Sequence, residues 1–470
     1  MNKVSILFIF LTIMFFSACG SDVHYYGIEY YIPYEEIEQE TQQNLSQSQS
    51  NTSIRWIELN EYARDIVIQD LNFLENAILD NVAILNVIYR RLGTTIDVIF
   101  ENLRATAIEL RPLQSSNSDS WIRDNNTNLD IAADYLFALL YQEPFFRTGI
   151  AHLSPISPDL FSDMRARAII QYNEEIEKES EFIDLFLLHL LDIYNSENVV
   201  WFYGNDIDLE IDSRGWMDNN NVSTEIIENY RIARIGMRHF MNSYETDSKI
   251  IIPFLKEIED FEHLIIDFRG HMGGYYNIFV DLILTPLLSE PVYSYRINFI
   301  TDGKKANHIF DISLESSAIQ NPETTSPIVM PIADFLDYFD INYVDDSDFE
   351  LLYKGIKYFI KFEPSEEYNI NFNGKIWLLV DSGSASAAEA AALDSIATNF
   401  ATVVGRRTRG VMPSPTSVFY LPNTGILFRM DLAYFPSSSG YSMEEFGIKP
   451  DILVPTGNIL NYLLKLIELK

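Results

Sequence analysis

Apolar residues in the first half of the chain recur every three or four positions. They do so between 56 and 113, between about 128 and 141, and between about 159 and 194. This spacing places apolar side chains on one face of an α-helix. We therefore expect residues 56–231 to form a mainly helical region.

The pattern changes after about residue 232. Short apolar runs rich in β-branched and aromatic residues then alternate with helical runs. The short runs read IARIGM, HLIIDF, YSYRINFI, KIWLLV, ATVVG and ILFRMDLAYF. Buried strands that alternate with helices are typical of a partly parallel sheet. The sequence therefore predicts an α/β domain over residues 232–470.

The first 18 residues have the pattern of an export signal. Lys3 precedes an almost wholly apolar run from Val4 to Phe16, which is shorter than the roughly 20 residues that span a bilayer. Small residues then lead to Cys19, as in the bacterial lipobox, although Phe16 stands where Leu is usual. We expect Cys19 to be lipidated and to become the N-terminus. The alternatives are an uncleaved anchor and a buried free thiol.

A polar stretch follows this signal. Residues 36–53 are rich in Gln, Ser and Asn and show no apolar period. Such a segment buries too little surface to offset the entropy lost on ordering. We expect residues 19–55 to be a flexible tether between a membrane and the folded part, which places the protein in the cell envelope outside the cytoplasm.

Charge and composition narrow the possible partners. The 470 residues include 33 Lys and Arg against 68 Asp and Glu, a net charge of −35. This balance argues against binding nucleic acid or anionic lipid through a basic patch, and 47% hydrophobic residues argue against a disordered chain. One Cys and no H-E-x-x-H motif leave no evident metal site, and no cofactor is expected.

The strongest chemical signal is the segment DSGSASAAE at residues 381–389. It lies between an apolar run and an alanine-rich helical run, so it predicts a strand, a small-residue turn and a helix. A serine in the first helical turn lies near unpaired backbone N–H groups and the positive end of the helix dipole, which stabilise developing negative charge. The plain structural role of Ser384 or Ser386 is a helix N-cap.

Three more motifs keep a fixed order around this turn. They are DFRGHMGG at 267–274, GRRTRG at 405–410 and EEFGIKPD at 444–451. Together the four motifs resemble those of the serine peptidases that comprise the tail-specific (C-terminal processing) proteases and the tricorn protease core. The resemblance covers about residues 232–454 and implies a ClpP/crotonase-like catalytic domain.

The resemblance also implies roles for individual residues. Ser386 takes the place of the nucleophile, and Ser384 is the nearby alternative. The oxyanion donors are expected to be the backbone N–H groups of Ala387 and Gly273, with Gly274 as the alternative to Gly273. Two converging N–H groups are what a tetrahedral intermediate requires.

The general base separates two branches of this family. Tail-specific proteases use a lysine in the region of the G-x-x-T-x-G loop, at the position that Val411 holds here, and no Lys lies between Ser386 and Lys449. The arginines of this loop stay protonated and cannot act as a base at neutral pH. The resemblance therefore favours the tricorn-like branch, which uses a His from the N-terminal segment and a Glu near the last motif.

Both of these residues have candidates. His152 ends the segment FRTGIAH, which looks like the family's G-x-x-H element, and Glu444 stands three residues before Gly447. His271 is the rival base, because it replaces an Asn that is common in the glycine turn. Glu445 is the rival acid.

These observations predict a lipid-anchored, extracytoplasmic serine endopeptidase that cleaves peptides or envelope proteins through an acyl-enzyme on Ser386. A PDZ domain is not expected, because only about 80 residues separate His152 from residue 232 and many of them have a helical pattern. The alternatives are a catalytically inactive relative that binds a peptide or an apolar ligand in the same cleft, and an acyl-CoA enzyme of the crotonase fold. The sequence leaves the oligomeric state open.

Overall fold

A computed structural model describes most of the folded part of the chain. The described residues are 55–115, 127–177, 184–204, 221–228, 231–241, 244–320, 327–341, 344–412, 416–437 and 440–468. The predicted signal peptide, Cys19 and nearly all of the predicted tether lie outside them. Within the described residues no single helix is long and apolar enough to cross a membrane; helices α3 and α4 meet that test only as a pair bent by 104°.

The N-terminal region is mainly helical, as the apolar spacing predicts. Its helices are α3 (Glu61–Asn81), α4 (Leu85–Leu92), α5 (Ile96–Ile108), α6 (Asn128–Gln142), α7 (Pro158–Glu177), α8 (Leu185–Tyr194) and α9 (Glu197–Tyr203), with short 3-10 turns at Pro144–Arg147 and Ile150–His152 and a small antiparallel pair of strands, β1 (Arg55–Ile57) and β2 (Leu113–Ser115). Polar N-caps fix where helices begin: Asn60 accepts from the N–H of Ala63, and Thr127 and Asp130 form a capping box. Gly93, in the left-handed conformation, ends α4.

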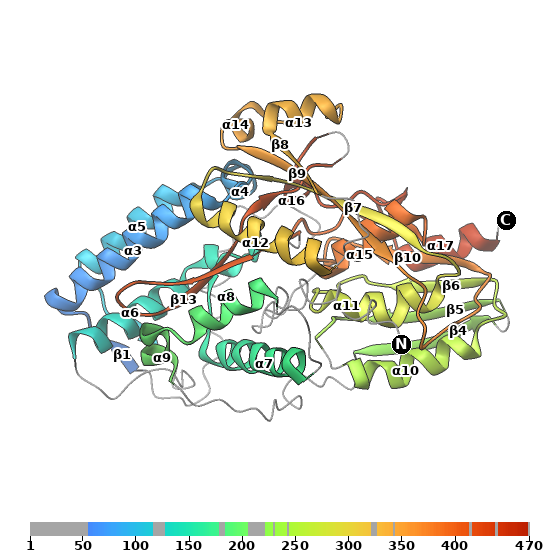
Figure 1. The fold of residues 1–470 in the computed structure, drawn as a ribbon, viewed down its shortest axis with the longest axis horizontal. Helices are drawn as coiled ribbons and strands as arrows, with labels where there is room; N and C mark the ends of the chain where they lie inside the picture. Colours follow the sequence, from blue (N-terminus) through green and yellow to red (C-terminus); the bar gives the residue numbers. More distant parts are fainter. Residues whose placement is uncertain are drawn as a thin grey trace.

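A six-stranded sheet forms the centre of the second half (Figure 1). In spatial order its strands are β15 (Ile452–Leu453), β11 (Thr402–Gly405), β10 (Lys375–Val380), β6 (His263–Asp267), β5 (Ile232–Met237) and β4 (Val222–Glu228). All neighbours are parallel except β4 and β5. The predicted α/β fold is thus confirmed, and β4 extends the sheet to residues before 232.

Helices cover both faces of this sheet. Alternate strand residues divide between two apolar clusters. On one face Ile265, Trp377 and Leu379 pack with Ile459 and Leu463 of α17 (Ile459–Glu468). The opposite face packs in the main core with helices α10 (Tyr244–Glu257), α11 (Tyr276–Phe279) and α15 (Ala387–Thr398). Burial on both faces explains why the central strands read as continuous apolar runs.

Two further sheets accompany the six-stranded sheet, and the second of them joins the N-terminal region to the later half of the chain. One has the order β14 (Ala433–Tyr434), β7 (Val292–Ile300), β9 (Lys354–Phe362), β8 (Ile328–Pro331); the other has the order β12 (Thr416–Tyr420), β13 (Leu427–Asp431), β3 (Ser154–Pro155). The remaining helices are α12 (Lys304–Gln320), α13 (Ile332–Tyr338), α14 (Asp346–Phe349) and α16 (Met443–Phe446), with further turns at Val280–Leu284 and Thr285–Leu287.

The late strand β13 lies among the N-terminal helices (Figure 1). It pairs with β3, and the loop before it binds α3, because Asp70 accepts hydrogen bonds from the backbone N–H and the hydroxyl of Thr424. The N-terminal region and the later half of the chain therefore share one core rather than meeting only at their surfaces.

Candidate active site

The predicted serine turn follows β10 and starts helix α15. Ser386 is the N-cap residue and is almost fully buried, with 2% of its surface exposed. Its backbone N–H donates to the carbonyl of Val411 (2.9 Å) and to the carboxylate of Glu389 (3.1 Å). Because β6 and β10 are parallel neighbours, with Leu379 opposite Asp267, the glycine turn and the serine turn leave the same edge of the sheet.

Ser386 has an unusual backbone conformation. Its φ is 56° and its ψ is −120°, a combination that residues other than glycine rarely adopt. Six non-glycine residues of the described part have positive φ, and three of these are Ala151, His152 and Ser386. Backbone strain of this kind concentrates at functional sites, where the surrounding structure holds it in place.

Ser384, the alternative nucleophile, is engaged elsewhere. It is completely buried, its hydroxyl donates to the carbonyl of Phe268 (2.7 Å), and the hydroxyl oxygen accepts from the N–H of Asp381 (3.0 Å). These bonds tie the serine turn to the neighbouring strand. Ser384 therefore has the contacts of a structural residue.

The glycine turn lies against Ser386. A Cβ atom on Gly273 would stand 2.7 Å from the Cβ of Ser386 and 3.1 Å from the nitrogen of Ala387, and φ at Gly273 is 90°. Both the close approach and the positive φ require glycine. The predicted nucleophile and the predicted oxyanion turn are thus brought into contact.

The two predicted oxyanion donors differ in their bonding. Within the described residues, no hydrogen bond acceptor is bound to the N–H of Ala387, which lies in the first turn of α15. The N–H of Gly273 donates to Nδ1 of His271 (3.0 Å). Gly274 lies opposite Phe240 in an isolated parallel bridge. Phe240 makes its backbone hydrogen bonds to the residues on either side of Gly274 and not to Gly274 itself. The N–H of Gly274 therefore points to the other side of its chain.

His271, the rival base, is fully buried in an apolar environment. Its ring lies 4.1 Å from that of Phe240 and 4.8 Å from that of Phe268, centroid to centroid. Burial holds its pKa well below the usual value for histidine. Nδ1 accepts from Gly273, and Nε2 has no hydrogen bond partner among the described residues, so the hydrogen bond that the His271 ring makes there stays within its own turn.

His152, the predicted base, makes a short contact with an acid that the sequence did not single out. Its Nδ1 lies 2.5 Å from Oδ2 of Asp431, and both side chains are buried. The other carboxylate oxygen of Asp431 accepts from the hydroxyl of Thr416 (2.6 Å). The β3–β13 pairing produces this contact, because Ser154, two residues after His152, lies opposite Arg429, two residues before Asp431.

Glu444, the predicted acid, is buried nearby but bonds to other groups. Its carboxyl accepts from the N–H of Phe435 (3.3 Å) and from the hydroxyl of Ser442 (3.0 Å). Burial raises the pKa of Glu444 to about 8, so this carboxyl is mostly protonated at pH 7. Within the described residues, the carboxylate that is hydrogen-bonded to the His152 ring is that of Asp431 and not that of Glu444.

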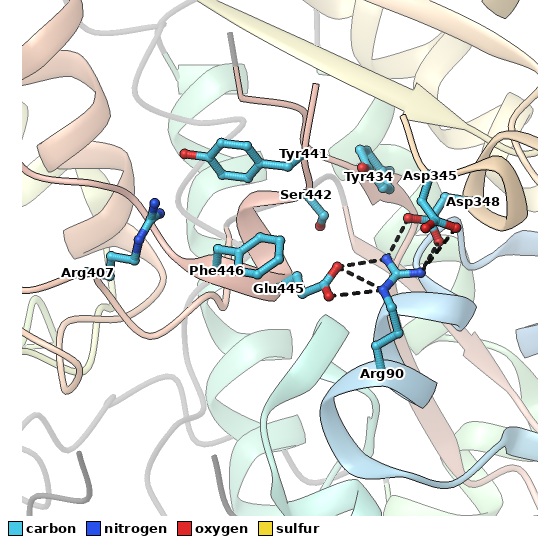
Figure 2. Close-up of a pocket in the computed structure, with 9 residues that line it drawn as sticks. All are labelled: Arg90, Asp345, Asp348, Arg407, Tyr434, Tyr441, Ser442, Glu445 and Phe446. Atoms are coloured by element: carbon cyan, nitrogen blue, oxygen red, sulfur yellow. Dashed lines mark hydrogen bonds and ion pairs between the residues drawn. The ribbon is translucent and has the colours of Figure 1, made fainter. Parts of the chain in front are cut away.

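Glu445, the rival acid, belongs to a pocket of about 460 Å³ beside α16 (Figure 2). The lining residues are Arg90, Asp345, Asp348, Arg407, Tyr434, Tyr441, Ser442, Glu445 and Phe446. Figure 2 shows the Arg90 guanidinium directed at three carboxylates, with nitrogen–oxygen distances of 2.7 Å to both Asp348 and Glu445. Glu445 is therefore committed to an ion pair.

The 408–411 loop (residues 408–411) connects the serine turn to the segment that carries His152. The backbone N–H of Arg409 donates to the carbonyl of Ser384 (2.9 Å), and its guanidinium lies 3.4 Å from the carbonyl of Thr148. Val411, at the position of the family's lysine, is buried and bonds through its backbone. This loop is thus the direct link between the two candidate catalytic segments.

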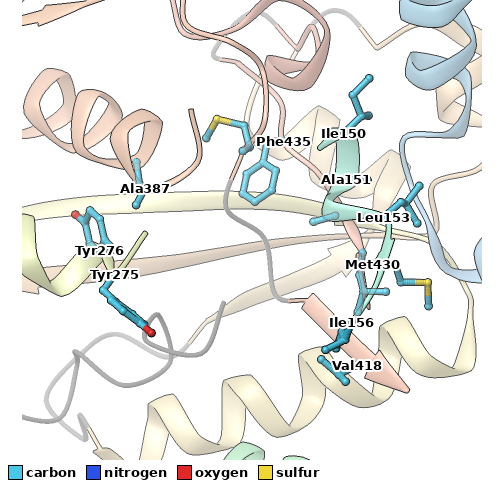
Figure 3. Close-up of a cluster of buried hydrophobic side chains, with 14 of the residues drawn as sticks. Ile150, Ala151, Leu153, Ile156, Tyr275, Tyr276, Ala387, Val418, Met430 and Phe435 are labelled. Atoms are coloured by element: carbon cyan, nitrogen blue, oxygen red, sulfur yellow. The ribbon is translucent and has the colours of Figure 1, made fainter. Parts of the chain in front are cut away.

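The side chains of His152 and Ser386 are not joined by a hydrogen bond in the described part of the chain. Their neighbours Ala151 and Ala387 belong to one cluster of buried side chains, and in Figure 3 the ring of Phe435 lies between them. The described residues also contain no group of three or more His, Cys, Asp or Glu side chains that could hold a metal ion.

Comparison with known proteins gives one family match. Residues 231–454 match the model of peptidase family S41. Similar solved structures include a putative peptidase from Parabacteroides merdae (12% identity, 85% of this chain and 96% of that chain, TM-score 0.42), mature CPAF complexed with lactacystin (13%, 87% and 98%, 0.43), and the photosystem II D1 C-terminal processing protease (16%, 50% and 49%, 0.31). No curated protein matches the chain significantly.

Proposed function

Residues 231–454 match peptidase family S41, and from this premise we propose that the chain is a serine endopeptidase of the cell envelope, lipid-anchored through Cys19, that cleaves peptides or envelope proteins through an acyl-enzyme on Ser386. The observation that carries the chemistry is the position of Ser386. It stands in a strained conformation at the N-terminus of α15, in contact with Gly273 and beside the N–H of Ala387, which has no acceptor among the described residues.

In this proposal His152 is the general base. A carboxylate only accepts hydrogen bonds, so Nδ1 of His152 carries a proton toward Asp431 and Nε2 is left as the proton acceptor. Nε2 removes the proton from the Ser386 hydroxyl as the hydroxyl oxygen attacks the peptide carbonyl carbon. The same proton then passes to the leaving amine, and water releases the acyl group by the reverse sequence.

We assign the orienting carboxylate to Asp431. A residue in this role must hold the imidazole in one tautomer and stabilise its positive form. Asp431 contacts Nδ1 directly, whereas Glu444 bonds to Phe435 and Ser442 and is mostly protonated at pH 7. Glu444, the residue expected from the family motif, then has a supporting role behind this pair.

The oxyanion donors in this proposal are the N–H groups of Ala387 and Gly274. The N–H of Gly273 is bonded to His271, so Gly273 acts by allowing close approach to Ser386, and Gly274 becomes the second donor. Donors that are preorganised in a water-poor site stabilise a developing oxyanion more strongly than water does.

One observation favours a second candidate function, an inactive relative that binds a peptide or apolar ligand. In the described part of the chain no hydrogen bond joins His152 to Ser386, and the ring of Phe435 lies between the adjacent residues in Figure 3. On this reading the apolar cluster is a binding surface and not a catalytic cleft.

A fluorophosphonate probe separates the two candidates. This probe reacts only with an activated serine, and mass spectrometry of the digested protein locates the label. The peptidase proposal expects labelling at Ser386 that Ser386→Ala abolishes and Ser384→Ala retains, provided that both variants fold. An unlabelled, folded wild-type protein would favour the binding function, and a label on Ser384 would reverse the assignment.

A further inference from the structure

Helix α4 of the N-terminal region ends in two adjacent arginines with different partners. Arg90 pairs with the carboxylates of Asp348 and Glu445 at the pocket in Figure 2. Arg91 instead donates to three backbone carbonyls, those of Gly410 (2.6 Å), Glu444 (2.5 Å) and Arg409 (3.2 Å). Among the described residues no carboxylate forms an ion pair with Arg91. Its role is therefore to bind backbone.

The carbonyls that Arg91 binds belong to two segments of the candidate active site. Gly410 and Arg409 are in the 408–411 loop, and Glu444 is in α16. These segments also touch each other, since a Cβ atom on Gly410 would stand 2.6 Å from the Glu444 carbonyl oxygen. Arg91 thus holds together a junction that is more than 300 residues distant from it in sequence.

The 408–411 loop passes this restraint on to the nucleophile. The carbonyl of Val411 accepts from the N–H of Ser386 (2.9 Å). The buried carboxylate of Glu389 accepts from the N–H groups of Gly410 (2.9 Å), Val411 (2.8 Å) and Ser386 (3.1 Å). A shift of the loop would therefore move the backbone of Ser386, whose strained conformation these bonds help to maintain.

Arginine is the residue that fits this junction. A guanidinium is planar and offers five N–H donors in a fixed fork, whereas a lysine ammonium offers three donors on one flexible atom. Here Nη1 donates to Gly410 and Glu444 and Nη2 donates to Arg409, so two segments are bound by one rigid group. Lysine would not reproduce this arrangement.

We infer that Arg91 is a positioning residue for Ser386: helix α4 fixes the 408–411 loop and thereby the geometry of the nucleophile turn. This inference rests on the proposed function, because it concerns the reactivity of the same serine. It makes the N-terminal helical region a working part of the active site in a second way, besides supplying His152.

The test measures the rate of fluorophosphonate labelling of Ser386 in the full chain. We expect Arg91→Ala to lower this rate about 10- to 100-fold, because small displacements of reacting groups cost about this much. Added methylguanidinium should restore part of the rate, and Arg91→Lys should restore little of it. Arg104→Ala is the matched control: it removes an arginine of the same helical region, paired with Glu75, and should label at the wild-type rate.

The outcomes are distinguishable. If the wild type is labelled and folded Arg91→Ala is labelled equally fast, the inference fails and the proposed function stands. If Arg91→Ala is slow but methylguanidinium, a denaturant at high concentration, only slows it further, Arg91 is a stabilising residue and the inference also fails. If Arg91→Ala does not fold, Arg91→Lys decides, and wild-type labelling of folded Arg91→Lys overturns the proposal. An unlabelled wild type rejects the proposed function itself.

Discussion

At the scale of single residues, hydrogen bonds distinguish the proposed catalytic side chains from their rivals. Ser384 and His271 looked like rivals of Ser386 and His152, and each bonds within its own turn or to the neighbouring strand. Ser386 and His152 remain, both at positive φ. The hydrogen bonds that each side chain makes, and not its residue type, thus distinguish the proposed reactive groups from their neighbours.

The assignment of the orienting acid leads to a direct comparison of two amides. Asp431→Asn should lower kcat or the labelling rate by about 10³-fold or more, because an amide no longer stabilises the required tautomer and charge of His152. Glu444→Gln should have a much smaller effect, since that carboxyl is already mostly protonated at pH 7. Steady-state kinetics on one peptide substrate checks both. The reverse order of effects would return the role to Glu444.

Glu444 should also leave a signature in the pH dependence of stability. Its folded pKa of about 8 lies above the usual value near 4.5. Between these values the unfolded chain releases a proton that the folded protein retains, so the free energy of unfolding falls as pH rises. Glu444→Gln removes this effect. The free energy of unfolding of the variant minus that of the wild type should therefore be more positive at pH 8 than at pH 5. Thermal melts at the two pH values measure it; a constant difference between the proteins contradicts it.

Gly273 offers a steric test with a matched control. Gly273→Ala places a methyl group 2.7 Å from the Cβ of Ser386, so labelling should fall about 100-fold. Gly270 also has positive φ, but a Cβ there meets no atom within 4 Å. Gly270→Ala should cost only about 1 kcal/mol of backbone strain and keep most labelling. Equal labelling of the two variants would show that the contact with Ser386 is unimportant.

At the scale of elements, the sequence predicts strands and helices better than it predicts their pairing. Apolar runs such as HLIIDF and KIWLLV identify buried strands, because both faces of the sheet are covered. Strand β3 has only two residues, Ser154 and Pro155, and carries no pattern of its own. Its pairing with β13 is what brings Asp431 to His152, so the acid was missed although it lies within the predicted strand run ILFRMDLAYF.

The sequence motif itself contains a further element-scale prediction. Glu389, the E of S-A-S-A-x-E, accepts from three backbone N–H groups and from the hydroxyl of Thr408 while fully buried. Glu389→Ala would leave these donors unbonded and should lower the free energy of unfolding by about 3 kcal/mol or more. Labelling of Ser386 should be lost with it. Glu389→Gln keeps one acceptor oxygen, so its free energy of unfolding should lie between those of the wild type and Glu389→Ala. Denaturant titration of the three proteins measures this order.

At the scale of the whole molecule, the proposed site depends on contributions from both halves of the chain. His152 and Arg91 come from the helical region, whereas Ser386, Asp431 and the 408–411 loop come from the later half. A family match over residues 231–454 therefore describes only part of the proposed site. Motifs gave candidates for the nucleophile and the base, because their residue types are distinctive. Arg91 is one of 33 basic residues and has no such signal.

The proposed membrane attachment has its own test. Cys19→Ala removes the thiol to be lipidated, so the acylated N-terminus can no longer form. In a bacterial host the variant should therefore move from the membrane fraction to the soluble extracytoplasmic fraction. Mass spectrometry of the wild type should show an acylated Cys19 at the N-terminus. An intact Met1 or an unmodified Cys19 would contradict the anchor.

In the proposed mechanism, the pairing of His152 with Asp431 sets the time at which the enzyme can first act. These residues are 279 positions apart, and a chain synthesised from its N-terminus contains the histidine long before strand β13 exists. The base therefore stays unoriented until almost the entire polypeptide has emerged. Closing such a distant contact is slow compared with forming local helices. On this proposal a nascent chain is unable to cut itself, and proteolytic activity begins only with the completed molecule.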